Sequence, residues 1–325
     1  MAEINAQLVK QLRDKTGAGM MECKKALIEA NGDLPQAEII LRKRGIAAAT
    51  KKESRSTKQG LISAFIAPSE KLGALVEVNC ESDFVARTED FQALAADVAS
   101  HIAEIKPKLV RVDEVTDAER ASFKAHEALY EQKFAKDQST TVGELVKSKI
   151  AKLGENIAVS RFILYEVNGS GVVANYIHTG AQIGTLLEVK TKSDDVLTNP
   201  EFRKLVHDIA MQIAASHPEF VSKEQVPENL LERERDIQRE RARGEGKPAK
   251  MIDKIAEGRM SKFYEEICLL EQPFIRENTI AVGELIRSAS EKLGETISVS
   301  RFVRYKVGDA MDAPGVEESP LPVTA

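Results

Sequence analysis

Hydrophobic and polar residues follow two recurring patterns along the chain, one typical of β-hairpins and one typical of amphipathic helices. Residues 60–103 contain strand-like runs, such as 74–80, followed by a helical face formed by Phe91, Leu94, Val98 and Ile102. Residues 171–214 align with this segment without gaps at an offset of 111, with a helical face formed by Phe202, Leu205, Ile209 and Ile213. Each segment therefore predicts a hairpin followed by a helix that packs against it.

A second block is also repeated. Residues 142–167 match residues 282–307 at an offset of 140, and 16 of the 26 positions are identical. Each copy begins with a helical pattern, turns at Gly154 or Gly294, and ends in an alternating strand. Three strands with helices on one face form a small α+β layer. We therefore predict an α+β fold with a duplicated core of small antiparallel sheets with helices, in two units, 60–170 and 171–307. Below, residues that these offsets align are called counterparts.

The second unit contains an insertion, because the two offsets, 111 and 140, differ by 29 residues. It falls within about 217–265, where a charged helical run at 230–241 precedes a Gly turn and a returning apolar pattern. This arrangement predicts a helical hairpin that projects from the core. We interpret the charge run as a solvated helix face. Residues 308–325 contain three Pro without periodicity and predict a flexible tail.

The first 45 residues predict a compact module of three short helices with a small core. A Gly-rich break at 16–19 separates the first helix from a second at 20–30, in which Cys23, Ala26 and Leu27 share one face.

Asp33 is suited to cap the third helix of this module, and Gly45 is suited to end it. Residues 46–59 lack a sustained apolar face and are rich in Lys, Arg and Ser. We therefore predict that 46–59 form a linker to the core.

The composition of the chain argues against several classes of function. The chain has 325 residues, is 42% hydrophobic and 30% charged, and carries a net charge of -5. This charge gives no general electrostatic reason to bind nucleic acid or an anionic membrane. No apolar run approaches the roughly 18 residues of a membrane-spanning helix, and the first residues do not resemble a signal peptide. Three widely spaced cysteines, Cys23, Cys80 and Cys268, suit reduced thiols in the cytoplasm rather than disulfides or a metal site.

One aromatic residue is out of place in a polar turn. Phe84 lies in the segment 81–87, between the strand-like run and the helix that starts near Phe91. Its counterpart is Asp195, so this position does not need an aromatic side chain to build the fold. We interpret Phe84 as an exposed anchor for a partner, since aromatic residues are favoured at interaction hot spots. The alternative is that Phe84 folds back into the core.

Asp83 has the counterpart Asp194. It either caps the turn or helix start, or acts as a polar contact beside Phe84. His178 lies at the predicted tip of the second hairpin, where its counterpart is Ala67. It is either simply solvated or a second contact point for the same partner.

Met20 and Met21 follow the Gly-rich break in the helical module. We expect one of them to fill the small core. The other would join Arg13 and Gly19 in an adaptable contact patch, because methionine suits partner-binding surfaces.

Motifs for catalysis are missing from the sequence. The Gly-rich string 244–247 lacks the spacing and the preceding strand of a phosphate-binding loop, and neither a zinc-protease nor a serine-hydrolase motif occurs. The five histidines show no ligand spacing. The sequence therefore favours a binding protein, not an enzyme, with no metal or cofactor of its own.

Several strings together resemble the bacterial elongation factor Ts family over roughly residues 1–307. The most specific is Val78-Asn79-Cys80-Glu81-Ser82-Asp83-Phe84-Val85-Ala86, in which Ser82 stands where the family usually has Thr. Others are residues 8–13 with 16–21, 257–260 and 271–274. The resemblance implies that residues 1–45 form a ubiquitin-associated-like three-helix module.

The resemblance also implies a function, guanine-nucleotide exchange on the GTPase elongation factor Tu in protein biosynthesis. Phe84 would enter an apolar pocket near the helices that hold the Mg²⁺ site of the GTPase, and displacement of those helices would release GDP. The inserted hairpin resembles the dimerisation (coiled-coil) module of the family. The partner-binding residues implied are Asp83, Phe84, Val85, Arg13, Gly19, Met20, Met21 and His178.

Two other functions stay open at this point. The chain could be a nucleotide-independent adaptor or chaperone-like interaction protein, which would ignore the nucleotide state of a GTPase. It could also be an enzyme of unrecognised type, which would turn over a substrate on its own.

Overall fold

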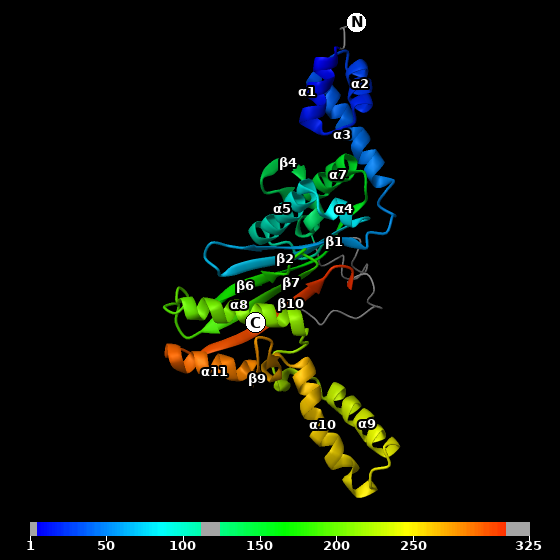
Figure 1. Cartoon of the computed structure of the whole chain (residues 1–325). Coiled ribbons are helices and arrows are strands. Elements are labelled where there is room, and N and C mark those ends of the chain that lie inside the picture. The colour runs from blue at the N-terminus through cyan, green and yellow to red at the C-terminus, as the bar shows by residue number, and fades with distance from the viewer. Residues whose placement is uncertain (1–4, 112–123, 310–325) are drawn as a thin grey trace.

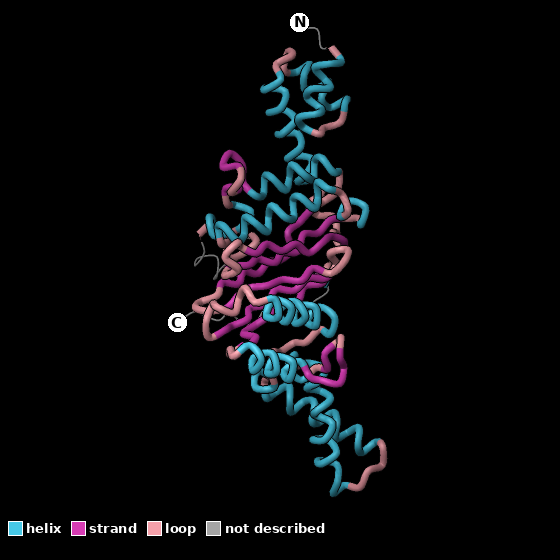
Figure 2. Tube along the Cα trace, turned by 60° about the vertical axis from the view of Figure 1, so that its left-hand side comes forward, coloured by secondary structure: helices cyan, strands magenta, loops and turns pink. Residues whose placement is uncertain are grey.

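The structure is a computed structural model that describes residues 5–111 and 124–309. The described part is elongated. A helical module lies at one end, two sheets face each other at the centre with helices on their outer faces, and a helical hairpin lies at the other end (Figure 1). Figure 2 shows the same order of layers from another side. The mixture of helices and small antiparallel sheets confirms the α+β class.

Three helices form the N-terminal module: α1 (Ala6–Thr16), α2 (Met20–Glu29) and α3 (Leu34–Thr50). The Asn5 side chain caps α1, and Asp33 caps α3 as predicted by accepting a hydrogen bond from the Gln36 amide. The buried core of the module includes Val9, Leu12, Cys23, Ala26, Leu27, Ala37 and Leu41. The prediction that Cys23, Ala26 and Leu27 face inward is confirmed.

The predicted end of the third helix at Gly45 is wrong, because α3 continues to Thr50. A Cβ on Gly45 would lie 3.0 Å from the Cβ of Ala151 in the core. Gly45 therefore allows close helix packing rather than ending a helix. Residues 46–50 of the predicted linker are helical, and Ala49 is fully buried in the core of the first unit.

The first unit contains a three-stranded antiparallel sheet in the order β1-β2-β5 and a separate two-stranded ribbon, β3-β4. Its strands are β1 (Gln59–Ile66), β2 (Leu72–Cys80), β3 (Lys133–Phe134), β4 (Asp137–Thr141) and β5 (Ile157–Glu166). Its helices are α4 (Asp83–Ala86), α5 (Glu89–Ile105) and α7 (Val142–Leu153).

The second unit has the equivalent strand order, β6-β7-β10, and its own ribbon, β8-β9. Its strands are β6 (Gly171–Ile177), β7 (Ile183–Thr191), β8 (Pro273–Phe274), β9 (Glu277–Ala281) and β10 (Ile297–Lys306). Its helices are α8 (Pro200–Ser216), α9 (Glu228–Gly244), α10 (Ile252–Ile267) and α11 (Val282–Leu293). The inserted helical hairpin is α9 and α10, as predicted.

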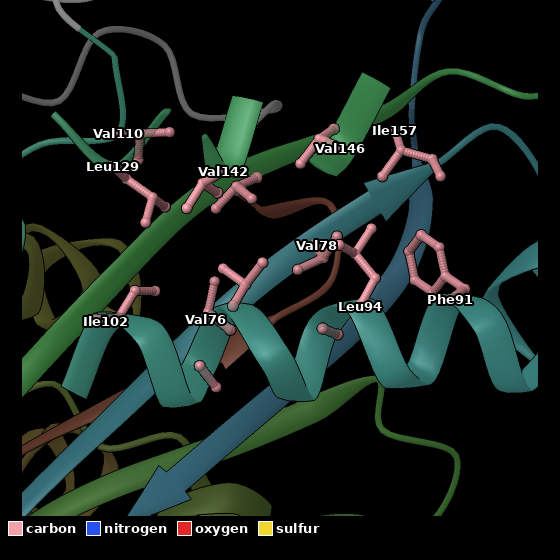
Figure 3. Close-up of a cluster of buried hydrophobic side chains, with 14 of the residues drawn as sticks. Val76, Val78, Phe91, Leu94, Ile102, Val110, Leu129, Val142, Val146 and Ile157 are labelled. Carbon is pink, nitrogen blue, oxygen red and sulfur yellow. The ribbon is translucent and has the colours of Figure 1, made fainter. Parts of the chain in front are cut away.

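A hydrophobic core lies between the helices and the sheet of each unit. In the first unit, Phe91 and Leu94 of α5 point toward β2, β5 and α7, where Val78, Ile157 and Val146 face them (Figure 3). Phe91 and its counterpart Phe202 are both buried, as predicted. A further cluster, which includes Ile62, Leu75, Val173 and Leu186, fills the space between the two sheets.

Most of the predicted flexible tail, residues 310–325, lies outside the described residues. Among the described residues, no helix has both the length and the apolar character needed to cross a membrane.

Candidate partner-binding surface

A short helical turn, α4, directly follows the end of β2 and carries Phe84. Ser82 caps α4 by accepting a hydrogen bond from the Val85 amide at 3.4 Å. Glu155, just after α7, accepts hydrogen bonds from the Ser82 amide and hydroxyl at 2.9 and 2.5 Å. Hydrogen bonds of Ser82 and Glu155 therefore hold the turn, and none of them involves the side chain of Phe84.

Within this turn, Phe84 points outward and its neighbours point inward. Phe84 is 80% exposed, the largest exposed fraction among the exposed large hydrophobic residues described. Val85 is half-buried against the core of the first unit, and Ala86 is buried in it. An exposed Phe forgoes roughly 1.5–3 kcal/mol of burial energy, so its exposure is not explained by folding. The expectation that Phe84 is exposed is confirmed, and the alternative of a fold-back into the core is wrong.

Asp83 begins α4 beside Phe84, but the capping residue is Ser82. The Asp83 carboxylate accepts a hydrogen bond from Arg87 at 2.8 Å, four residues along the chain. Both side chains are substantially exposed, so the pair contributes little stability and leaves the carboxylate accessible to a partner.

The counterpart turn in the second unit is held in the same way, but its aspartate binds the opposite unit. Glu295, the counterpart of Glu155, accepts hydrogen bonds from the Ser193 amide and hydroxyl. Asp194 accepts hydrogen bonds from Lys71 at 2.7 Å and from the Gly171 amide, and these bonds lower its pKa. Thus Asp83 pairs with Arg87 of its own turn, whereas Asp194 pairs with Lys71 of the opposite unit.

An open groove of about 1130 Å³ lies beside the Phe84 turn. It is lined by 59–64 of β1, by Ser82, Asp83 and Arg87 of the first-unit turn, and by Ile177 and 180–182 of the second hairpin. The groove therefore lies between the first-unit turn and the second hairpin, and His178, at the tip of that hairpin, directly follows the lining residue Ile177.

His178 is exposed at the tip of the hairpin between β6 and β7. Its Nδ1 lies 3.0 Å from the hydroxyl of Tyr176, which fixes the ring orientation. The hairpin bends through Gly180 and Ala181, both with a positive φ. His178 is therefore available to a partner that also covers the groove.

The third group of predicted residues lies on the helical module. Met20 and Met21 are 45% and 64% exposed at the start of α2, next to Gly19, its N-cap. The expectation that one methionine fills the core is wrong, because Cys23, Ala26 and Leu27 already complete it and both methionines project from the first turn. Arg13 is exposed on α1, so these residues are all accessible.

No group of three or more His, Cys, Asp and Glu side chains within 5–111 and 124–309 could hold a metal ion. The cysteines of the described chain are free and buried, and burial raises the pKa of Cys80 to about 12, which makes it a poor nucleophile.

Sequence reasoning missed the groove and the contacts between the helical module and the core. The groove arises from two units whose relative placement no local pattern encodes. The contact between the helical module and the core has one signal in the sequence. Gly45 and Ala151 are small residues on two helices that pack closely in the structure.

The fold and this surface together define an α+β protein that presents an exposed aromatic residue on a helical turn, with further exposed side chains on the second hairpin and on the helical module. The family model described as Elongation factor TS matches residues 81–309. The chain is 42% identical to elongation factor Ts of Nostoc punctiforme over 96% of this chain and 95% of the relative. It is 43% identical to that of Solibacter usitatus, over 98% and 99%, and 42% identical to that of Aquifex aeolicus, over 94% and 98%. The chain belongs to the elongation factor Ts family of translation elongation factors.

Proposed function

We propose that the chain is a guanine-nucleotide exchange factor that binds elongation factor Tu in its GDP form and promotes GDP release. The observation that carries this proposal is Phe84, held 80% exposed on a turn that is built without it. A rigidly presented aromatic residue is suited to enter an apolar pocket of a partner. Entry of Phe84 would displace helices of the GTPase near its Mg²⁺ and phosphate site and so weaken GDP binding.

This activity requires coupling between two binding events and no catalytic group. If the chain weakens nucleotide binding about a thousandfold, the coupling free energy is about 4 kcal/mol. Nucleotide must then weaken binding of the chain by the same factor. Burial of one Phe together with a few polar contacts is of this order.

The remaining predicted residues would support the contact. Asp83 and Val85 would flank Phe84, and His178 would contact the GTPase across the groove. Arg13, Gly19, Met20 and Met21 would bind a helix of its nucleotide domain. Both methionines being exposed supports the wider patch.

The domain interpretation is part of the same proposal. Residues 1–45 would be a ubiquitin-associated-like module, and the core would descend from a duplication. The equivalent strand orders β1-β2-β5 and β6-β7-β10 support the duplication. We assign the activity to the cytoplasm, in agreement with three free cysteines.

The test is release of a fluorescent GDP analogue from elongation factor Tu, with and without the chain. We expect fast release with the native chain and release at least about 30-fold slower with Phe84→Ala, which corresponds to about 2 kcal/mol. Asp195→Ala, at the counterpart position, is the matched control and should leave release fast. Binding that ignores the bound nucleotide, without release, would instead support an adaptor.

A further inference from the structure

Helix α3 belongs to two hydrophobic cores at once. Near its start, Ala37 and Leu41 are buried in the core of the helical module. Near its end, Ala49 is fully buried in the core of the first unit. Because one uninterrupted helix contributes to both cores, the module and the first unit have no flexible joint between them (Figure 1).

The packing of α3 on α7 depends on small side chains. A Cβ on Gly45 would lie 3.0 Å from the Cβ of Ala151, closer than nine in ten such contacts in proteins. Even an Ala at position 45 therefore requires Ala151 to move by a few tenths of an ångström, and we expect a larger side chain to push the two helices further apart.

Polar contacts join the two helices at both ends of α7. At its start, Arg42 donates hydrogen bonds to Glu144 at 3.0 Å and to Thr140 at 3.3 Å. At its end, Lys52 donates to the carbonyl of Gly154 at 2.6 Å. Exposed contacts of this kind add little stability each, but they fix the direction of approach.

Helix α7 is also tied to the elements that carry the candidate contact residues. Lys149 and Lys152 both bind Asp90, in the first turn of α5 just after the Phe84 turn, at 2.8 Å. These two bonds lower the pKa of Asp90. The stem of Lys152 also lies against Gly17, where a Cβ would be 2.7 Å from Lys152 Cε. Gly17 follows the last turn of α1 and lies three residues before Met20.

We propose that α3 and α7 form a rigid connection that holds the Met20–Met21 patch at a fixed distance from Phe84, with Gly45 as its positioning residue. This inference rests on the proposed function, in which both patches contact one GTPase. Two contacts on one rigid body bind together with less loss of entropy than two contacts on a flexible chain. Residues that touch no partner would then control how strongly the two patches cooperate.

The test combines three variants. Gly45→Leu should separate the helices while keeping α3 helical, since Leu has a higher helix propensity than Gly. The double variant Gly45→Ala with Ala151→Gly moves one methyl group across the interface and should restore the native approach. Gly258→Leu is the matched control, because Gly258 lies in α10 with open space around it.

The first readout is a distance between spin labels on Lys24→Cys and Glu89→Cys, both exposed positions, with the native cysteines buried. We expect one narrow distribution for the native background, the double variant and Gly258→Leu, and a shifted or broadened one for Gly45→Leu. An unchanged distribution in Gly45→Leu, or a broad one in the native background, would overturn the proposal.

The second readout is GDP release in a double-mutant cycle. In the native background Met21→Ala should slow release several-fold, and in the Gly45→Leu background it should have almost no further effect. Phe84→Ala should slow release in both backgrounds, which shows that Gly45→Leu remains folded. An equal effect of Met21→Ala in both backgrounds would refute cooperation of the two patches. If the native chain does not accelerate GDP release from elongation factor Tu, the proposed function fails. The distances between the spin labels still decide whether Gly45 holds the module in place.

Discussion

Phe84 and Phe91 lie seven residues apart, and their surroundings are opposite. Phe91 is fully buried between α5, α7 and the sheet, whereas Phe84 is almost fully exposed. The counterparts differ in the same sense, since Phe202 is buried and Asp195 is exposed. At this scale, the repeat serves as an internal control that separates an aromatic residue needed for folding from one that is not.

We expect Phe91→Ala to lower the free energy of unfolding by about 3–5 kcal/mol, because it leaves a cavity in the core. Phe84→Ala should change it by less than about 0.5 kcal/mol, since the exposed ring makes few contacts. Urea unfolding of both variants measures the difference. Comparable losses would show that Phe84 supports the fold.

The buried side chain of His101 predicts that the stability of the protein depends on pH. Its Nδ1 accepts a hydrogen bond from the Ala135 amide at 3.1 Å, so the ring is neutral and its Nε2 donates to Gln132. Burial lowers the pKa of His101, partly offset by the hydrogen bond to Gln132 and by Glu104. The counterpart, Gln212, makes the same two hydrogen bonds, with Ile275 and Gln272, without a titratable group.

Because the folded pKa is lowered, unfolding takes up a proton at His101. The stability from neutral His101 is therefore complete above the unfolded pKa of about 6.5 and decreases as the pH falls below it, by at most about 1.4 kcal/mol per pH unit. His101→Gln should remove this component. Urea unfolding at several pH values between 5 and 8 tests it, with His217, which also has a lowered pKa, present in both proteins. Equal slopes for native and variant would rule out His101 as the source.

At the scale of elements, two strands carry a reciprocal contact between the units. The guanidinium of Arg161 on β5 lies 4.1 Å from the ring centroid of Tyr305 on β10, and that of Arg301 on β10 lies 4.2 Å from that of Tyr165 on β5. Each arginine also binds a buried carboxylate of its own sheet, Glu77 or Glu188, at 2.7–2.8 Å. The two sheets are thereby held in a symmetric arrangement.

We expect Arg161→Ala to destabilise the protein by about 3 kcal/mol, because it leaves the Glu77 carboxylate buried without its cation and removes the contact with Tyr305. Arg233→Ala, at an exposed position on α9, is the control and should change stability by less than about 0.5 kcal/mol. Chemical unfolding measures both. A loss of stability below about 1 kcal/mol for Arg161→Ala would mean that the Glu77 carboxylate becomes hydrated or protonated in the variant.

For the whole molecule, the α9–α10 hairpin lies at the opposite end from the helical module (Figure 1). Its charges largely pair with one another, as when Arg235 binds Glu228 and Glu232, and Arg239 binds Asp253. This pairing agrees with a solvated helix face. Ile237 and Met251 remain exposed on it, and a dimer of the kind that the family resemblance implies for this hairpin would cover them.

A shortened chain has a Gly-Ser turn in place of residues 236–256. We expect it to promote GDP release from elongation factor Tu as the native chain does, because Phe84 lies in the other unit. If the hairpin mediates dimerisation, the native chain sediments as a dimer and the shortened chain as a monomer. Sedimentation equilibrium and GDP release on the same samples separate the two roles. Slow release by the shortened chain would contradict this division.

The sequence by itself determined the α+β class, the helical hairpin of α9 and α10, the cap at Asp33 and the exposure of Phe84. These follow from hydrophobic periodicity, from local hydrogen bonding and from comparison of counterparts, all of which are visible along the chain. Only the tertiary structure decided whether Gly45 ends a helix, whether both methionines are exposed, and that a groove lies between the units. A glycine can end a helix or admit a neighbouring one, and only the position of Ala151, over one hundred residues away, selects between these. The groove and the Arg–Tyr contacts likewise depend on how the two sheets pack against each other, and no local sequence pattern predicts that packing.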